Sequence, residues 1–331
     1  MEAVHDALGV QWFDGPGGRV PRNYGDPGAE YDAARSGVVI ADRTDRAFIR
    51  VYGRDPVKMI QGLISNDVEK ASPERSVYAT VLTPKGKMVA DARVLRRGDD
   101  LLLELDAGAL DGLVAHLRKY VPPLYARFED ARDRLREIGV YGPAAAVLVR
   151  AVLGIDVGTI AEDDVRTGTF DDDEVIVVAT AMYDVPGYDL FVPANRAEEI
   201  WAALMAGGAR PVGHATLEVL RIEAGRPRWG AELTYDRFPL EAGLRERAIS
   251  ESKGCYTGQE VIIRILHRGH VNWNLKQLML GDAAVPASGT EIVDDAGKVV
   301  QRITSAAWSP KYGQTVALAY VRRGSDAEPD V

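Results

Sequence analysis

The segment Lys253-Gly254-Cys255-Tyr256-Thr257-Gly258-Gln259-Glu260 contains the only cysteine of the chain. Thr257 and Glu260 have the spacing of a capping box, in which Thr and a Glu three residues later cap the first turn of a helix. The apolar run Val261-Ile262-Ile263 follows directly. We therefore expect a helix to begin at Thr257, with Cys255 two residues before it.

Such a position favours a reactive cysteine. The positive end of the helix dipole and the ammonium of Lys253 would both favour the thiolate and lower the pKa of Cys255. Gly254 and Gly258 on either side allow tight turns or the close approach of a ligand. The alternatives are that Cys255 is a small buried apolar side chain and that Glu260 only completes the helix cap.

Histidines near this segment do not complete a familiar metal site. His267 and His270 could join Cys255, but their spacing matches no standard zinc pattern. We therefore predict no bound metal.

Two short matches separated by 89 residues indicate an internal repeat. Val51-Tyr52-Gly53 recurs as Val140-Tyr141-Gly142, and Asp100–Leu103 corresponds to Asp189–Val192. Each copy reads as a strand, a helix, further strands and a second helix. The repeat predicts two related α+β modules.

After Trp273 the pattern changes to short strands. The candidates are Leu275–Leu280, Glu291–Val293, Lys298–Ile303 and Val316–Val321. Several short strands at this spacing predict a small all-β sandwich or barrel.

The composition excludes several classes of protein. Hydrophobic residues make up 46% of the 331 residues and charged residues 27%, which is typical of a globular protein. No apolar run approaches the roughly 18 residues needed to span a bilayer. A lone cysteine forms no intramolecular disulfide, which fits a reducing compartment, so we expect a cytoplasmic protein without membrane contact.

The net charge of −9 argues against direct binding to tRNA or other nucleic acids, whose affinity comes largely from Lys and Arg meeting phosphates. A local basic patch remains as an alternative to an ordinary solvated face. Its candidate residues are Arg264, His267, Arg268, His270 and Lys276.

The segment Lys253–Glu260 resembles the KGCYxGQE motif of YgfZ-like proteins, a folate-binding branch of the glycine-cleavage T-protein superfamily. Every defined position of that motif is present. Other segments resemble the superfamily as well, over roughly residues 35 to 322. They are Ser65-Asn66-Asp67-Val68, Thr83–Met88, Leu220–Gly225 and Pro239–Ala242.

The resemblance implies an α+β fold with two ferredoxin-like modules and a C-terminal small antiparallel β-barrel, arranged as a cloverleaf around a central channel. We expect residues 1–45 and 130–255 to form the first module, which would bind folate and includes the second copy of the repeat. Residues 46–129 would form the second module. Residues 256–331 would form a helix and the barrel domain.

One departure from the T-protein pattern separates two branches. T-proteins carry an acidic pair after the corresponding hairpin, and one of its carboxylates assists aminomethyl transfer to tetrahydrofolate. Here the pair reads Ala90-Asp91. Loss of a proton-handling group typically costs on the order of 10²- to 10⁴-fold in rate. Ala90 and the cysteine motif together favour the YgfZ-like branch.

That branch implies a tetrahydrofolate-binding protein that supports maturation or repair of iron–sulfur enzymes and, through them, tRNA modification. Its partners would be a reduced folate and iron–sulfur proteins or their assembly factors. One alternative is a folate-dependent aminomethyltransferase or other one-carbon transferase. Another is a non-catalytic scaffold for iron–sulfur assembly partners, with the basic residues at 264–276 as the contact.

Folate binding needs a carboxylate for the N–H donors of the pterin and cations for the glutamate tail. We expect three residues to take part in the chemistry: Cys255, Lys253 and Asp91. The candidates for folate binding are Glu223, Glu241 and Asp184 for the pterin, Arg221, Arg228 and Arg264 for the tail, Tyr256 and Trp229 for stacking, and Asn66 of the Ser65–Val68 segment.

Overall fold

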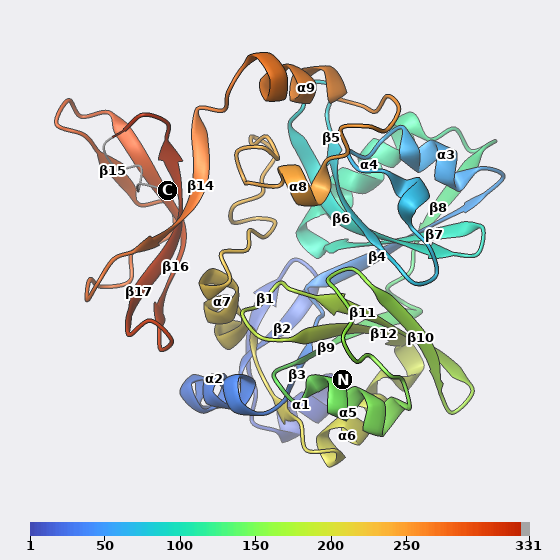
Figure 1. Cartoon of the computed structure of the whole chain (residues 1–331). Coiled ribbons are helices and arrows are strands. Elements are labelled where there is room, and N and C mark those ends of the chain that lie inside the picture. The colour runs from blue at the N-terminus through green and yellow to red at the C-terminus, as the bar shows by residue number, and fades with distance from the viewer. Residues whose placement is uncertain (326–331) are drawn as a thin grey trace.

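The computed structural model, shown in Figure 1, describes residues 1–325 of the chain. Its described strands form a five-stranded, a six-stranded and a four-stranded sheet, together with a short N-terminal hairpin. The two larger sheets pack on each other through a shared apolar layer that includes Phe48, Leu102, Ile176 and Phe191. The mixed α+β class predicted from the sequence is confirmed.

The five-stranded sheet is antiparallel throughout and is covered on one face by two helices. In spatial order its strands are β5 (Val77–Leu82), β6 (Met88–Arg97), β7 (Asp100–Asp106), β4 (Arg46–Gly53) and β8 (Ala126–Asp130). The covering helices are α3 (Pro56–Gln61) and α4 (Leu110–Tyr120). Leu113 and Leu117 of α4 are fully buried against the sheet because they lie one turn apart on the same helix face.

The six-stranded sheet has helices on both faces. Its order is β10 (Val165–Phe170), β11 (Asp173–Thr180), β12 (Gly187–Pro193), β9 (Leu135–Tyr141), β3 (Val39–Asp42) and β13 (Arg210–Pro211), the last parallel to β3. One face packs on α5 (Ala145–Leu153) and α6 (Ala197–Ala206). The other packs on α2 (Pro27–Ser36) and α7 (His214–Glu223).

The internal repeat predicted from the sequence is present in the order of the strands. The run β5-β6-β7-β4 of one sheet corresponds to β10-β11-β12-β9 of the other. Val51-Tyr52-Gly53 closes β4, and Val140-Tyr141-Gly142 closes β9. The number of ferredoxin-like modules and the domain limits given above stay predictions.

The C-terminal sheet stands to one side of the larger sheets in Figure 1 and packs on α7 through Ile222, Val316 and Leu318. Its antiparallel order is β14 (Trp273–Met279), β17 (Gln314–Arg322), β16 (Val299–Ser309) and β15 (Glu291–Val293). All four predicted strands are present, but β16 continues to Ser309, six residues beyond its predicted end. Because β14 and β15 lie at opposite edges, the described strands form an open sheet rather than a closed barrel.

Shorter elements complete the chain. They are α1 (Glu2–Ala7), the hairpin of β1 (Gln11–Gly15) and β2 (Gly18–Asn23), α8 (Arg245–Ala248), α9 (Gln259–Arg268), and the 3-10 turns Val68–Lys70, Ala107–Ala109 and Ala194–Arg196. Ile262 of α9 packs into the core of the five-stranded sheet. No helix within residues 1–325 is long and apolar enough to cross a membrane.

Candidate functional site

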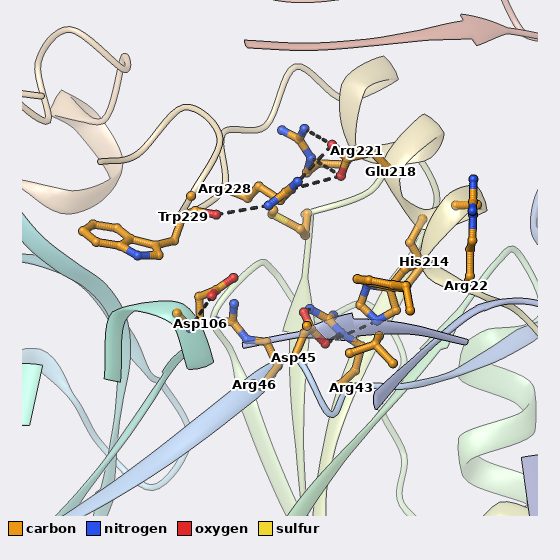
Figure 2. Close-up of a pocket in the computed structure, with 18 of the residues that line it drawn as sticks. Arg22, Arg43, Asp45, Arg46, Asp106, His214, Glu218, Arg221, Arg228 and Trp229 are labelled. Carbon is orange, nitrogen blue, oxygen red and sulfur yellow. Dashed lines mark hydrogen bonds and ion pairs between the residues drawn. The ribbon is translucent and has the colours of Figure 1, made fainter. Parts of the chain in front are cut away.

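A cavity of about 780 Å³ opens where the N-terminal hairpin, α7 and the end of β7 come together. Figure 2 shows that its wall is rich in charged side chains. The lining residues labelled there are Arg22, Arg43, Asp45, Arg46, Asp106, His214, Glu218, Arg221, Arg228 and Trp229. The volume falls in the range of small-molecule sites.

A second, inner chamber of about 50 Å³ adjoins this cavity. Five residues line both spaces, namely Arg43, Arg46, Met182, Arg228 and Trp229. The chamber lies between the two larger sheets and is bordered by Tyr78 and Asp91 on one side and Glu137 and Asp189 on the other. Asp91 therefore lies at the inner end of a continuous polar region.

Asp91 faces the chamber because of its position on β6. Successive residues of a strand point to opposite faces of the sheet. Ala90 is fully buried in the apolar core under α3 and α4, and Asp91 points the other way. The expectation that Ala90 removes a carboxylate from the site is therefore wrong, since this position never faces the chamber. Only one member of an acidic pair on this strand can reach it.

The carboxyl group of Asp91 is held by one neighbour. The hydroxyl of Tyr78 donates to Oδ2 over 2.8 Å, and Oδ1 has no hydrogen-bond partner within residues 1–325. Burial raises the pKa of Asp91 above its usual range, although the guanidinium of Arg46 opposes this. A buried carboxyl group with a raised pKa is suited to proton transfer.

The other carboxylates of the cavity differ in how they are paired. Two nitrogens of the Arg43 guanidinium, Nε and Nη2, each donate to a carboxylate oxygen of Asp45 over 3.0 Å. Burial opposes ionisation of Glu218, but Arg221 and Arg228 lower its pKa to about 2. These two carboxylates are thus already neutralised by arginines.

Asp106 is the more open carboxylate of the cavity. Its Oδ1 accepts the backbone N–H of Gly108 over 2.8 Å, and no ion pair to it is formed within residues 1–325. Burial raises the pKa of Asp106 to about 6, against the opposing charge of Arg46. In Figure 2 it faces the cavity between Arg46 and Trp229.

His214 contributes an imidazole at the first residue of α7. Its Nε2 lies 3.3 Å from the carbonyl oxygen of Asp42 and 3.4 Å from Oδ1 of Asp45. Burial lowers the pKa of His214, so the ring is neutral at physiological pH.

Two of the residues expected to bind folate do line the cavity. Arg228 is partly exposed and pairs with Glu218 over 3.2 Å, and Trp229 forms part of the wall between cavity and chamber. Both are therefore placed to meet a ligand.

Arg221 also borders the cavity, but its side chain is only 1% exposed. Its guanidinium donates to two carboxylates, a hydroxyl and a carbonyl. These partners are Glu218, Glu232, Ser305 and the backbone oxygen of Arg226. Its described contacts give Arg221 the role of tying α7 to β16 rather than that of a free cation.

The three carboxylates expected to bind the pterin lie outside the cavity lining. Glu223 accepts hydrogen bonds from Tyr31, Arg35 and Ser309. Asp184 pairs with Arg35 over 2.9 Å and Lys311 over 2.5 Å. Glu241 accepts the backbone N–H of Phe238 over 2.9 Å. Their contacts are structural, because each carboxylate is already occupied by protein donors.

Asn66 and Tyr256 are also used by the fold. The amide of Asn66 donates to the carbonyl oxygens of Tyr78 and Arg247, over 2.8 and 3.1 Å. Tyr256 is buried in the core of the five-stranded sheet. Neither residue lines the cavity or the chamber.

The cysteine segment docks on the loop after α3. The ammonium of Lys253 donates to the carbonyl oxygens of Gln61, Ile64 and Asn66 over 2.7, 2.9 and 2.7 Å, and these bonds hold the segment on that loop. Burial lowers the pKa of Lys253 to about 8. Cys255 itself is exposed and lines neither space, so the expectation of a buried thiol or one at the cavity does not hold.

The predicted capping box is wrong. The helix begins at Gln259 with Gly258 as its N-cap, and no side chain caps it. The hydroxyl of Thr257 instead approaches the carbonyl oxygen of Gly62 at 3.4 Å. Gly258 has φ +84°, and a Cβ there would lie 2.6 Å from the carbonyl oxygen of Thr83, so the turn requires glycine.

We expect Lys253→Met to lower the free energy of unfolding by about 1–3 kcal/mol, because three buried carbonyl groups lose their donor. Urea unfolding followed by circular dichroism measures the change. Glu260→Ala, at an exposed position of the same segment, should stay within about 0.5 kcal/mol of the wild type. Equal stability of Lys253→Met and wild type would show that these three bonds do not hold the segment.

The sequence did not identify five residues of the cavity, namely Arg43, Asp45, Arg46, Asp106 and His214. A visible sign was the charged run Asp42–Arg46 between two apolar strands, where a short connection ordinarily carries small polar residues. Asp106 and His214 carried no comparable sign, because only the fold brings them to the same wall. Within residues 1–325 no group of three or more His, Cys, Asp or Glu side chains is arranged to hold a metal ion.

Known protein families and relatives match this chain over nearly its full length. The family model described as GCVT N-terminal domain matches residues 1–253, and that of the glycine cleavage T-protein C-terminal barrel domain matches residues 274–330. The aminomethyltransferase of Cutibacterium acnes is 28% identical over 343 residues, covering 100% of this chain and 90% of the relative. That of Acidobacterium capsulatum is 26% identical over 329 residues, covering 97% and 87%.

The crystal structure of the glycine cleavage system aminomethyltransferase T from Bartonella henselae has the same fold. It superposes with a TM-score of 0.87 at 20% identity, covering 97% of this chain and 88% of that one. With both matched regions in the same order along one chain, the protein belongs to the glycine cleavage T-protein family, as an N-terminal GCVT domain followed by the C-terminal domain of that family.

Proposed function

We propose that the protein is a folate-dependent one-carbon transferase of the aminomethyl type, with tetrahydrofolate bound in the 780 Å³ cavity. The observation that carries this proposal is Asp91, a buried carboxyl group with one free oxygen in the chamber that adjoins the cavity. Relatives of nearly the full length are named aminomethyltransferases, which supports the same reaction class.

The residues of the cavity fit a reduced folate. A pterin presents paired N–H donors, and the open carboxylate of Asp106 is the acceptor best placed for them. Trp229 supplies an aromatic wall beside it. Arg22 and Arg228 line the same cavity and could meet the carboxylates of the glutamate tail. A one-carbon unit carried by the folate would be transferred within this enclosure.

In this proposal Asp91 handles the proton that must move when the carbon unit changes partner. Tyr78 fixes one oxygen of the carboxyl group, which leaves Oδ1 to face the reacting atoms. The raised pKa favours the protonated form, which would supply a proton to a departing amine or thiol. The surrounding arginines would hold anionic parts of the substrates.

Calorimetric titration with tetrahydrofolate tests the binding half of the proposal. We expect saturable heat from the wild type with one site per chain. If millimolar tetrahydrofolate produces neither binding heat nor thermal stabilisation, the proposal that the protein binds folate is wrong.

The pH dependence of binding tests the role of Asp106. Its ionised form would accept the N–H groups of the pterin, and burial holds its pKa at about 6. Affinity should therefore be constant above pH 6 and fall below it, by up to about tenfold per pH unit. The charged groups around it are Arg46, which favours ionisation, and Asp45 and Asp91, which oppose it.

Asp106→Asn is a matched variant, since an amide oxygen can still accept the N–H of Gly108. This variant should bind tetrahydrofolate more weakly at pH 7.5, and its affinity should not change between pH 5 and 7. If Asp106→Asn binds tetrahydrofolate with the affinity and pH dependence of the wild type, Asp106 does not bind the pterin.

The YgfZ-like role in iron–sulfur enzyme maturation and tRNA modification is the second candidate. The observation that favours it is the exposed thiol of Cys255 within an intact KGCYxGQE motif. Because Lys253, Tyr256 and Gly258 have structural explanations, Cys255 is the residue of this motif left for chemistry. The scaffold alternative would use the exposed Arg264 and Arg268 of α9, with their neighbouring histidines.

We expect Cys255→Ala, expressed in a strain lacking the protein, to leave iron–sulfur enzyme activity at the level of the deletion if this second role holds. The exposed Ser252→Ala is the matched control and should restore activity. Full restoration by Cys255→Ala would exclude a thiol-dependent role.

A further inference from the structure

Two carboxyl groups of the inner chamber are not the closest partner of any arginine in its wall. Each arginine of its wall has its closest carboxylate already assigned: Arg43 with Asp45, Arg46 with Glu104, Arg93 with Asp189, Arg228 with Glu218 and Arg247 with Glu162. Asp91 and Glu137 are left over. The closest cation to Glu137 is Nη1 of Arg43 at 3.7 Å, beyond hydrogen-bond distance.

Each of these two carboxyl groups also has one buried oxygen that accepts no hydrogen bond from the described residues. Oδ1 of Asp91, Oε2 of Glu137 and Nε of Arg93 are buried without a hydrogen-bond partner within residues 1–325. Each of the three residues is less than 9% exposed and lines the 50 Å³ chamber. Buried polar atoms are nearly always paired, and a polar space of this size accommodates water. Water in the chamber would join the two carboxyl groups.

We propose that Glu137 holds a reserve proton for Asp91 and passes it through water in the chamber. This inference rests on the proposed function, since it gives Asp91 the role of proton donor. When protonated Asp91 gives its proton to the leaving group, a water molecule protonates Asp91 and takes the proton of Glu137. Glu137 is then an anion, and no electrons are exchanged.

The charges around Glu137 suit this cycle. Burial raises the pKa of Glu137 above its usual range, and the carboxylates of Glu104 on β7 and Asp189 on β12 raise it further. Arg43, just after β3, and Arg46, at the start of β4, lower it. Burial and the two neighbouring carboxylates thus favour the protonated form. The two guanidinium groups stabilise the anion after the proton has left.

Infrared difference spectroscopy at neutral pH tests the reserve proton directly. The carbonyl stretch of a protonated carboxyl group is separate from carboxylate bands and shifts in D₂O. We expect the wild type to show such bands from Asp91 and Glu137, and Glu137→Gln to lose the band of Glu137 while that of Asp91 remains. Asp163→Asn is the matched control and should keep both bands.

Asp163 suits this purpose because it pairs with Arg93 over 3.6 Å but does not line the chamber. Its backbone φ of 72° is one that asparagine tolerates. The control therefore makes the same acid-to-amide change outside the proposed path.

Asp91→Asn tests the water link without changing Glu137. The band of Asp91 should disappear, and that of Glu137 should shift in frequency, because the hydrogen bonds that reach Glu137 through the chamber change. Two results would overturn the inference. One is that Glu137→Gln removes no band of the wild type. The other is that Asp91→Asn leaves the Glu137 band at its wild-type frequency. If Glu137→Gln fails to fold, the Asp91→Asn shift decides alone. Failure of the wild type to bind tetrahydrofolate counts against the proposed function and leaves the band test unaffected.

Discussion

Replacing Asp91 by Asn is expected to slow one-carbon transfer by about 10²- to 10⁴-fold, the usual contribution of a positioned proton-handling group. Affinity for tetrahydrofolate should change only a few-fold, because the amide keeps the size of the side chain and can still accept the Tyr78 hydroxyl. Formation of methylenetetrahydrofolate from tetrahydrofolate and a small S-aminomethyl donor, followed by mass spectrometry, measures the rate.

Two comparisons make this result specific. Asp163→Asn should transfer at the wild-type rate, since Asp163 lies outside both the cavity and the chamber. Ala90→Asp should restore nothing and should destabilise the protein, because the new carboxylate would enter the apolar core. If Asp91→Asn transfers the one-carbon unit at the wild-type rate, Asp91 takes no part in the mechanism.

Arg221→Met is expected to lower the free energy of unfolding by about 3–5 kcal/mol, the usual cost of removing one partner from a buried ion pair. The change would leave Glu232, which is fully buried, without its guanidinium partner at 2.9 Å. Ser305 and the carbonyl of Arg226 would also lose their donor. Urea unfolding measures the loss.

Arg228→Ala is the contrasting variant, because Arg228 is 44% exposed and pairs with Glu218 near the surface. It should change the free energy of unfolding by no more than about 1 kcal/mol while weakening tetrahydrofolate binding. If Arg221→Met instead kept full stability and lost only folate affinity, the sequence-based assignment of Arg221 to the folate tail would be right.

The sequence predicted much of the fold because its main features are local or repeated. The 89-residue offset located β4, β7, β9 and β12, since each contains all or most of a matched segment. The strands after Trp273 were readable from alternating residues and turn sequences. The capping box failed because Gly258 packs against the hairpin turn at Thr83, a contact between distant segments that spacing alone does not reveal.

The site was harder to predict, because burial and pairing decide which charged residue is free. Glu223 and Asp184 have suitable chemistry for pterin binding, yet Arg35 occupies both. Asp106 has the same chemistry and remains open, but it ends an ordinary strand. Ala90 and Asp91 are adjacent in sequence and lie on opposite faces of β6, so the missing acid did not separate the two branches.

Crystals grown with tetrahydrofolate provide the most direct test that this cavity is a folate site. Electron density for the pterin is expected in the cavity beside Trp229, with its N–H edge on Asp106 and the reacting nitrogens toward Asp91. Density for tetrahydrofolate at any other place on the protein, with this cavity free of ligand, would contradict the proposed site and the chemistry assigned to Asp91.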